Sequence, residues 1–260
     1  MKRKFFFLSS DNHRLCGILS DPVGNKDRPL ILLCHGLATG KDGRTCVSLE
    51  NMLNRKRFAT FRFDLFGHGE SAGDFADLTI SEAADDVRSA LRFVKDSGYR
   101  RIGLVGSSFG GFASILTASR TDDLFVLALK SPVTDYLGLL IARDQGKDCE
   151  DWKRAGHIVI SGPDGQARRL SYTFYEDAAK IRADICARKI SVPTLIVHGD
   201  RDETVPLSQS LKANRLIPDC RLRIIQGADH MYSDPEHYES MLGLISDFIV
   251  RQGHGGDPIT

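Results

Sequence analysis

The sequence lacks a long apolar run and a marked excess of charge of either sign. No stretch of about 18 consecutive apolar residues occurs in it, which argues against a membrane-spanning helix. Its 35 basic residues nearly balance its 34 acidic residues and leave a formal net charge of +1. Because nucleic acids and anionic membranes are bound through basic patches, we expect neither a nucleic-acid partner nor a membrane partner.

The sequence also lacks short cysteine spacings. Its six cysteines form no C-x-x-C pair, so neither a zinc cage nor a disulfide framework is indicated. They are Cys16, Cys34, Cys46, Cys149, Cys186 and Cys220. The apolar run at residues 5–8 is too short for the core of a signal peptide. We therefore expect reduced thiols and a cytoplasmic location.

Short apolar runs bounded by glycine, proline or charged residues recur along the chain. Residues 4–9 and 15–20 flank a turn and predict an antiparallel hairpin at the start. Six further runs have the composition of strands buried on both faces of a parallel sheet. They cover residues 30–34, 59–63, 102–105, 125–129, 194–198 and 222–225. Because helical patterns separate these runs, the sequence predicts an α/β fold in one domain, with a mostly parallel, doubly wound sheet.

Two helix starts carry clear capping signals. Thr79 followed by Glu82 has the form of a capping box, and an apolar stripe at helical spacing follows it. Pro235 after Asp234 suits the first position of the last helix, where the missing proline N–H costs nothing. Both positions are predicted helix N-termini.

The alternation of strands and helices stops between residues 131 and 190. Connections in compact domains are usually shorter than about 15 residues, so this stretch predicts an inserted lid. The core then comprises residues 1–130 and 191–251, and residues 252–260 form a flexible tail. Aromatic residues of the insert either line a substrate pocket or form a small core of their own. The candidates for substrate binding are Tyr136, Trp152 and Tyr175.

The segment Gly106-Ser107-Ser108-Phe109-Gly110 joins a predicted buried strand to a predicted helix. This is the context of a nucleophile elbow, in which glycines two residues before and after the serine permit a tight turn. Only Ser108 has glycine at both positions. The start of the helix also directs N–H groups toward that serine, where an oxyanion would form. We expect Ser108 to be a nucleophile.

A second N–H group can reach the same oxyanion from His35-Gly36-Leu37, which follows an earlier strand. We expect the N–H groups of Leu37 and Phe109 to form the oxyanion hole, with His35 orienting the loop. Asp64 and His68 lie in a glycine-rich turn after the next strand, but a metal site needs further converging ligands. We expect no metal ion and no organic cofactor.

A serine needs a base and an orienting acid, which should follow other strands at the same edge of the sheet. His230 follows the predicted strand at 222–225, and Asp200 and Asp202 both follow the strand at 194–198. Asp229 is next to His230 in sequence and therefore poorly placed to face its ring. The remaining histidines lack a comparable context and are expected at the surface or in packing. They are His13, His68, His157, His198, His237 and His254.

These motifs occur in the order Ser, Asp, His, and the chain resembles the α/β-hydrolase superfamily from its first hairpin to its last helix. Residues 106–110 are similar to the family's nucleophile elbow, residues 35–37 to its oxyanion segment and His230 to its base. The resemblance selects Asp202 over Asp200, because Asp202 matches the acid in the family's H-G-D-x-D-x-x-V-P pattern. It implies a Ser-His-Asp triad and an α/β-hydrolase fold.

A narrower resemblance is to feruloyl and cinnamoyl esterases, and it is carried by residues 64–71, 73–75 and 78–80. It implies a serine carboxylesterase that hydrolyses small acyl or aryl esters through an acyl-enzyme intermediate. A thioesterase and an amide or small-peptide hydrolase would use the same triad, and a non-catalytic binding module could share the scaffold. The expected partner is a small-molecule ester, and a homodimer stays open.

Overall fold

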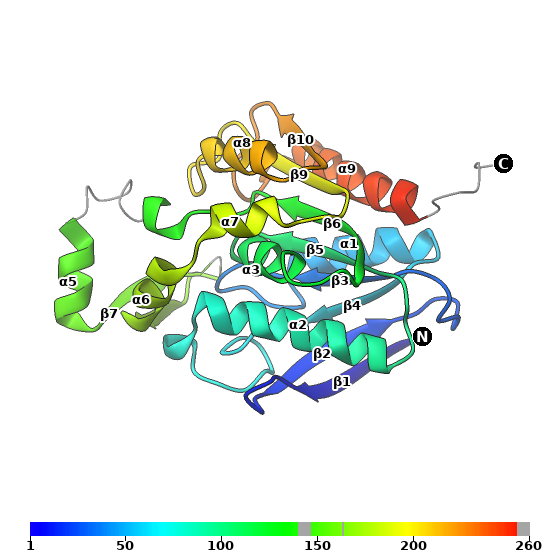
Figure 1. Ribbon diagram of the computed structural model, residues 1–260, viewed down its shortest axis with the longest axis horizontal. Coiled ribbons are helices and arrows are strands. Elements are labelled where there is room, and N and C mark those ends of the chain that lie inside the picture. Colours follow the sequence, from blue (N-terminus) through cyan, green and yellow to red (C-terminus); the bar gives the residue numbers. More distant parts are fainter. Residues whose placement is uncertain (140–146, 163, 254–260) are drawn as a thin grey trace.

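A mixed β-sheet runs through the centre of the protein (Figure 1). The computed structural model describes residues 1–139, 147–162 and 164–253. The strands of this sheet are β1 Lys2–Leu8, β2 Arg14–Ser20, β3 Leu30–Cys34, β4 Ala59–Phe63, β5 Ile102–Ser107, β6 Leu124–Lys130, β9 Thr194–Gly199 and β10 Cys220–Ile225. They lie in the order β1-β2-β4-β3-β5-β6-β9-β10.

The directions of the strands confirm the predicted sheet type. β2 pairs antiparallel with both β1 and β4, which makes β1 and β2 the predicted leading hairpin. The pairs that join β4, β3, β5, β6, β9 and β10 are all parallel. The carboxyl ends of these six strands therefore meet at one edge, where an open α/β sheet ordinarily binds its ligand.

Helices cover both faces of the sheet, as the prediction of a doubly wound fold requires. They are α1 Arg44–Arg55, α2 Ile80–Asp96, α3 Phe109–Ala118, α8 Leu207–Leu216 and α9 Pro235–Gly253, with a 3-10 turn, η1, at Phe75–Asp77. Residues of α1 and α9 belong to one apolar cluster, and residues of α2, α3 and α8 belong to the other. β3 shows why its sequence is continuously apolar: Leu30 and Leu32 enter one cluster, while Ile31 and Leu33 enter the other.

The two predicted helix starts are confirmed. The Thr79 hydroxyl accepts a hydrogen bond from Glu82 N–H at 3.0 Å, while the Glu82 carboxylate pairs with His13 Nδ1 at 3.0 Å. The last helix begins at Pro235 and continues through Gly253. Residues 252 and 253 are thus helical, although the sequence placed them in the tail, because Gly253 is buried against Phe58. The rest of the predicted tail, residues 254–260, lies outside the described residues.

The predicted insert, residues 131–190, contains a small antiparallel sheet that the sequence did not predict. Its described elements are α5 Lys147–Ala155, β7 His157–Ser161, β8 Ala167–Ser171, α6 Thr173–Lys180 and α7 Ala183–Arg188. Figure 1 shows α5, β7 and α6 together beyond one end of the central sheet. Asp177 of α6 accepts hydrogen bonds from Ser81 N–H at 2.9 Å and Ser81 Oγ at 2.6 Å, which joins the insert to the start of α2.

Five cysteines carry free thiols, namely Cys16, Cys34, Cys46, Cys186 and Cys220. The side chain of Cys149 lies outside the described part of the chain. None of the described helices has both the length and the apolar character needed to cross a membrane.

Candidate active site

Ser108 stands at the turn between β5 and α3 in a conformation that few side chains adopt. Its φ of 52° and ψ of −114° place it in a strained region of backbone space. The flanking glycines make the turn possible. A Cβ on Gly106 would collide with Ser114 Oγ, and a Cβ on Gly110 would collide with the backbone oxygen of His35. This is the sharp strand-to-helix elbow that the sequence predicted. Ser108 is partly exposed at the turn.

The structure brings together the three residues selected from the sequence as a triad. Ser108 Oγ lies 3.1 Å from His230 Nε2, and His230 Nδ1 lies 2.7 Å from Asp202 Oδ2. These contacts fit one tautomer, in which Nδ1–H donates to the carboxylate and Nε2 accepts from the serine hydroxyl. The three side chains come from loops after β5, β9 and β10, at the edge where the parallel strands end.

The neighbouring aspartates have other partners. Asp200 accepts a hydrogen bond from Gly227 N–H at 2.6 Å, and Asp229 accepts one from Ser233 N–H at 2.9 Å. The second carboxylate oxygen of Asp202, Oδ1, accepts from Thr204 N–H and Val205 N–H at 2.9 and 2.7 Å. The loop therefore fixes the orientation of Asp202 while Oδ2 faces His230.

The charges at this site suit a neutral base beside an ionised acid. Burial lowers the pKa of His230; Asp202 opposes this shift, and the positive charge of Lys130 adds to it. Burial alone would raise the pKa of Asp202, but hydrogen bonding with His198 and His230 outweighs it and holds that pKa well below its ordinary value. His230 is thus able to accept a proton near neutral pH.

The segment from His35 to Leu37, which the sequence predicts to supply an oxyanion donor, lies against Ser108. A Cβ on Gly36 would stand only 3.5 Å from Ser108 Cβ. The N–H groups of Leu37 and Phe109 donate to no acceptor within residues 1–139, 147–162 and 164–253. Two N–H donors are therefore available beside the serine hydroxyl.

Two buried histidines hold this loop in place. Leu65 N–H donates to His35 Nε2 at 3.0 Å, and Ala38 N–H donates to His68 Nε2 at 3.1 Å. The other nitrogen of each ring donates to a backbone carbonyl at 2.8 Å, that of Gly36 for His35 and that of Phe66 for His68. Burial lowers the pKa of both rings, so each is neutral and can accept these bonds. His35 orients the loop as predicted from the sequence, and His68 is one of the expected packing histidines.

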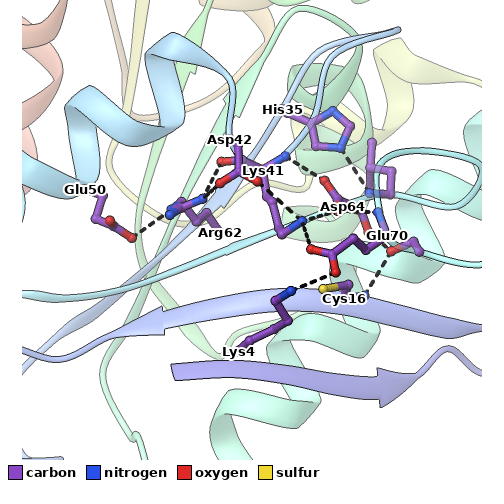
Figure 2. A network of polar contacts seen from close by, with 11 residues as sticks. Lys4, Cys16, His35, Lys41, Asp42, Glu50, Arg62, Asp64 and Glu70 are labelled. Atoms are coloured by element: carbon purple, nitrogen blue, oxygen red, sulfur yellow. Dashed lines mark hydrogen bonds and ion pairs between the residues drawn. The ribbon is translucent and has the colours of Figure 1, made fainter. Parts of the chain in front are cut away.

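A network of charged side chains extends the same loop toward β1 and β4 (Figure 2). Asp64 accepts from the N–H and the Nζ of Lys41, both at 2.7 Å, and Lys41 Nζ also lies 2.9 Å from Glu70. Lys4 contacts the other oxygen of Glu70 at 2.8 Å. Arg62 binds the Lys41 carbonyl at 3.1 Å, Glu50 at 2.9 Å, and Asp42. Asp64 thus ties the loop after β3 to the turn at residues 64–71.

No group of three or more His, Cys, Asp or Glu side chains is arranged to hold a metal ion among the residues that the structure describes. In the turn considered for metal binding, Asp64 is bound to Lys41 and His68 to a backbone N–H.

The aromatic side chains of the insert form one cluster with the helix that follows Ser108. Phe174 contacts Phe109 with ring centroids 6.0 Å apart, Tyr136 at 4.9 Å and Trp152 at 6.4 Å. Trp152 is 3% exposed, and its Nε1 donates to the Leu170 carbonyl at 3.1 Å. Tyr136 and Tyr175 are half-buried. The cluster therefore reaches from the insert to Phe109, whose N–H is a candidate oxyanion donor.

Two buried basic residues touch the candidate triad without having been selected from the sequence. Lys130 ends β6 and donates from Nζ to the His230 carbonyl at 2.6 Å. His198 in β9 places Nε2 3.2 Å from Asp202 Oδ2. In the sequence, Lys130 could be noticed only as a lysine at the end of an apolar strand, and His198 only as the histidine of the H-G-D pattern. The expectation that His198 lies at the surface or in packing misses this contact.

Comparison with known proteins gives relatives of several hydrolytic activities. The mouse palmitoyl-protein thioesterase ABHD10, a mitochondrial protein, is 26% identical over an alignment of 232 positions that covers 86% of this chain and 76% of the mouse protein. The 2-(acetamidomethylene)succinate hydrolase of Mesorhizobium japonicum is 27% identical over an alignment of 253 positions that covers 85% of this chain and 88% of that hydrolase. These relatives support the prediction that the chain is a hydrolase.

A solved structure agrees with the fold and with the narrower resemblance noted in the sequence. Est1E from Butyrivibrio proteoclasticus, solved with ferulic acid bound, superposes with a TM-score of 0.78 and 26% identity over 95% of this chain and 98% of Est1E. The profile of the alpha/beta hydrolase family matches residues 31–239, a range that includes most of the sheet and the three residues of the candidate triad. The chain belongs to the alpha/beta hydrolase family.

Proposed function

We propose that this chain is a serine esterase that hydrolyses small carboxylic esters, with Ser108 as nucleophile, His230 as general base and Asp202 as the orienting acid. The continuous contact from Ser108 Oγ through His230 to Asp202 carries this proposal, with distances of 3.1 and 2.7 Å. The strained backbone at Ser108 supports it, because such strain collects at functional sites.

The reaction proceeds in two acyl-transfer steps. His230 Nε2 removes the proton from Ser108 Oγ as that oxygen attacks the ester carbonyl, and the N–H groups of Leu37 and Phe109 stabilise the resulting oxyanion. The tetrahedral intermediate collapses, and the alcohol leaves with the proton from His230. Water then attacks the acyl-enzyme with His230 again as base, and the carboxylic acid is released from Ser108.

The electrostatics of the site support these roles. Burial and the nearby charge of Lys130 keep His230 neutral at physiological pH, so it can act as a base. Asp202 remains ionised and stabilises the imidazolium that forms when the serine proton is taken. An imidazole that was protonated at rest could not start the reaction.

Aromatic or short acyl esters are the proposed substrates. Two observations support this class: Est1E is similar in fold and has been solved with ferulic acid, and an aromatic cluster contacts Phe109 of this chain. A thioester is the second candidate, because the mouse relative is a palmitoyl-protein thioesterase. Both classes would use the same serine chemistry and differ in the leaving group.

Covalent labelling and a substrate panel test the proposal. A fluorophosphonate probe should label the wild-type chain and Ser107→Ala, while Ser108→Ala should be unlabelled and lose about 10⁴ to 10⁶ in kcat at an unchanged fold. The panel contains methyl ferulate, p-nitrophenyl esters of increasing chain length, a palmitoyl thioester and an amide. If the wild-type chain is neither labelled nor active on any of these compounds, the scaffold is a binding module and the proposal is wrong.

A further inference from the structure

His198 occupies an unusual place beside the acid of the candidate triad. It lies in β9, four residues before Asp202, and both side chains are fully buried. The same oxygen of Asp202 that faces His230 at 2.7 Å also lies 3.2 Å from His198 Nε2. One carboxylate oxygen is therefore placed between two imidazole rings.

The partners of His198 determine which nitrogen carries its hydrogen. Nε2 faces two acceptors, the Val205 carbonyl at 2.9 Å and Asp202 Oδ2 at 3.2 Å, so this nitrogen is the donor. Nδ1 lies 2.6 Å from the hydroxyl of Ser210, which can donate to it. Ser210 is itself fully buried, in α8. The hydroxyl thus sets the tautomer that presents N–H to Val205 and Asp202.

We propose that His198 is a positioning residue for catalysis, which acts through Asp202 to hold the His230 ring and to limit its basicity. This inference rests on the proposed triad. It adds Ser210 and His198 to a series of polar contacts that continues through Asp202 to His230 and Ser108.

The physical reason lies in how a buried carboxylate is satisfied. Oδ1 of Asp202 is held by two backbone N–H groups, while the contacts of Oδ2 within the described part of the chain are with the two imidazoles. Removal of the His198 N–H leaves Oδ2 with His230 as its one strong donor, and the carboxylate then attracts the proton of His230 more strongly. The ionisable groups that act on the pKa of His230 are Asp202, Lys130 and His198 itself. Asp202 and Lys130 remain in such a variant, and the effect of His198 is to lower this pKa, so its removal acts in the same direction. Loss of His198 should therefore raise the pKa of His230. It should also reduce kcat, because Asp202 then holds the His230 ring less firmly in position.

A purely structural role for His198 is the competing explanation, because the ring also holds the Val205 carbonyl and fills buried space. The two explanations differ in how His198 and Asp202 interact energetically. If His198 acts through Asp202, its replacement has little effect on catalysis once Asp202 is already changed. A structural role lowers activity by the same factor in either background.

The experiment is a double-mutant cycle on the full chain with His198→Leu, Asp202→Asn and the pair, read as the rate constant for fluorophosphonate labelling of Ser108. We expect His198→Leu alone to slow labelling by about 10- to 100-fold and to move the acidic limb of its pH profile upward. In the Asp202→Asn background the same change should cost less than about twofold. Equal factors in both backgrounds, or an unmoved acidic limb, would overturn the proposal.

Two conservative variants distinguish the loss of the His198 hydrogen bond from misfolding. The amide nitrogen of Gln reaches the position of His198 Nε2, whereas that of Asn reaches only the position of Nδ1. We expect His198→Gln to restore labelling to within about fivefold of wild type and His198→Asn to remain as slow as His198→Leu. The reverse order contradicts the proposal. If the wild-type chain is labelled at Ser108 while the cycle is additive, only the role of His198 is rejected; if it is not labelled, the proposed function falls and this inference falls with it.

Discussion

Lys130 Nζ donates a hydrogen bond of 2.6 Å to the backbone carbonyl of His230, a residue one hundred positions later in the chain. The backbone carbonyl of the same lysine accepts from Ser108 N–H at 2.9 Å. Lys130 is 4% exposed, and burial lowers its pKa to about 8. One residue at the end of β6 thus forms hydrogen bonds with both the loop of the candidate nucleophile and the loop of the candidate base.

Replacement of Lys130 by Met should remove the hydrogen bond to the His230 carbonyl and a positive charge together, while the backbone bond to Ser108 N–H stays. We expect kcat/KM to fall by on the order of tenfold, the cost of one hydrogen bond from a charged donor. The charge of Lys130 lowers the pKa of His230, so the acidic limb of the pH profile should move to higher pH. The measurement is kcat/KM from pH 5 to 9, with exposed Lys189→Met as the matched control. An acidic limb that stays in place would show that the lysine charge does not act on His230.

Substitutions of Asp202 and Asp200, the two acidic candidates in the loop after β9, should differ clearly in their effects on kcat and on stability. Asp202→Asn removes the carboxylate that orients His230, and we expect kcat to fall by roughly 10⁴ because the wrong tautomer becomes favoured. Asp200 accepts a hydrogen bond from Gly227 N–H, away from His230, so Asp200→Asn should lower the melting temperature and leave kcat within a few fold. Kinetics and thermal melts of both variants test this. The assignment would be reversed if Asp200→Asn had the larger effect on kcat at an unchanged melting temperature.

The sequence predicted those parts of the fold that depend on local pattern. The runs at 30–34 and 59–63 match β3 and β4 at both ends, because a strand buried on two faces is rich in apolar residues. β3 is apolar throughout, whereas β4 also carries buried Thr60 and Arg62. The turn at Ser108 was predictable for a similar reason, since glycine is required at both flanking positions. The hairpin β7–β8 was missed because its sequence signal is weak. The apolar run in β7 is only three residues long, Ile158 to Ile160, and β8 carries Arg168 and Arg169.

Contacts between distant loops could not be predicted in this way. Lys130 has the sequence context of a strand end, and only the approach of the loop after β10 gives it the His230 carbonyl as an acceptor. His198 likewise became a neighbour of Asp202 only when the chain after β9 turned back on itself. In both cases the signal was a polar residue where the pattern expects an apolar one, which shows an unusual position but not its partner.

The pH dependence of stability should reflect the buried imidazole of His68. Burial, with the neighbouring His35, lowers its pKa from 6.5 to about 3 in the folded chain. Between these pH values the unfolded chain binds more protons, so the folded state loses stability as pH falls below 6.5 and the loss ends near pH 3. By pH 5 this amounts to about 2 kcal/mol. Denaturant unfolding of the wild-type chain at pH 7.5, 6 and 5 measures it.

A variant without the imidazole isolates this contribution. His68→Gln should be less stable than the wild-type chain at pH 7.5, because the Phe66 carbonyl loses the Nδ1–H donor of the ring. The difference between the two chains should then narrow by about 2 kcal/mol at pH 5, since glutamine does not titrate. His157→Gln, in the half-exposed strand β7, serves as the control and should follow the wild-type curve. A constant difference across the pH range would mean that His68 does not titrate with unfolding.

The aromatic residues of the insert should differ in role: Trp152 should serve packing, and Tyr136 should affect substrate preference. Trp152 is 3% exposed and bonded to the Leu170 carbonyl, so Trp152→Ala should lower stability by about 3 to 5 kcal/mol and leave substrate preference unchanged. Tyr136 is half-buried and packs on Phe109, with ring centroids 6.1 Å apart, next to the candidate oxyanion donor. We therefore expect Tyr136→Ala to change the ratio of kcat/KM between aryl and alkyl esters by about tenfold, or 1.4 kcal/mol, with Tyr175→Ala intermediate. If all three variants melt earlier and keep the wild-type ratio, the cluster serves packing alone and the selectivity of Ser108 is set elsewhere.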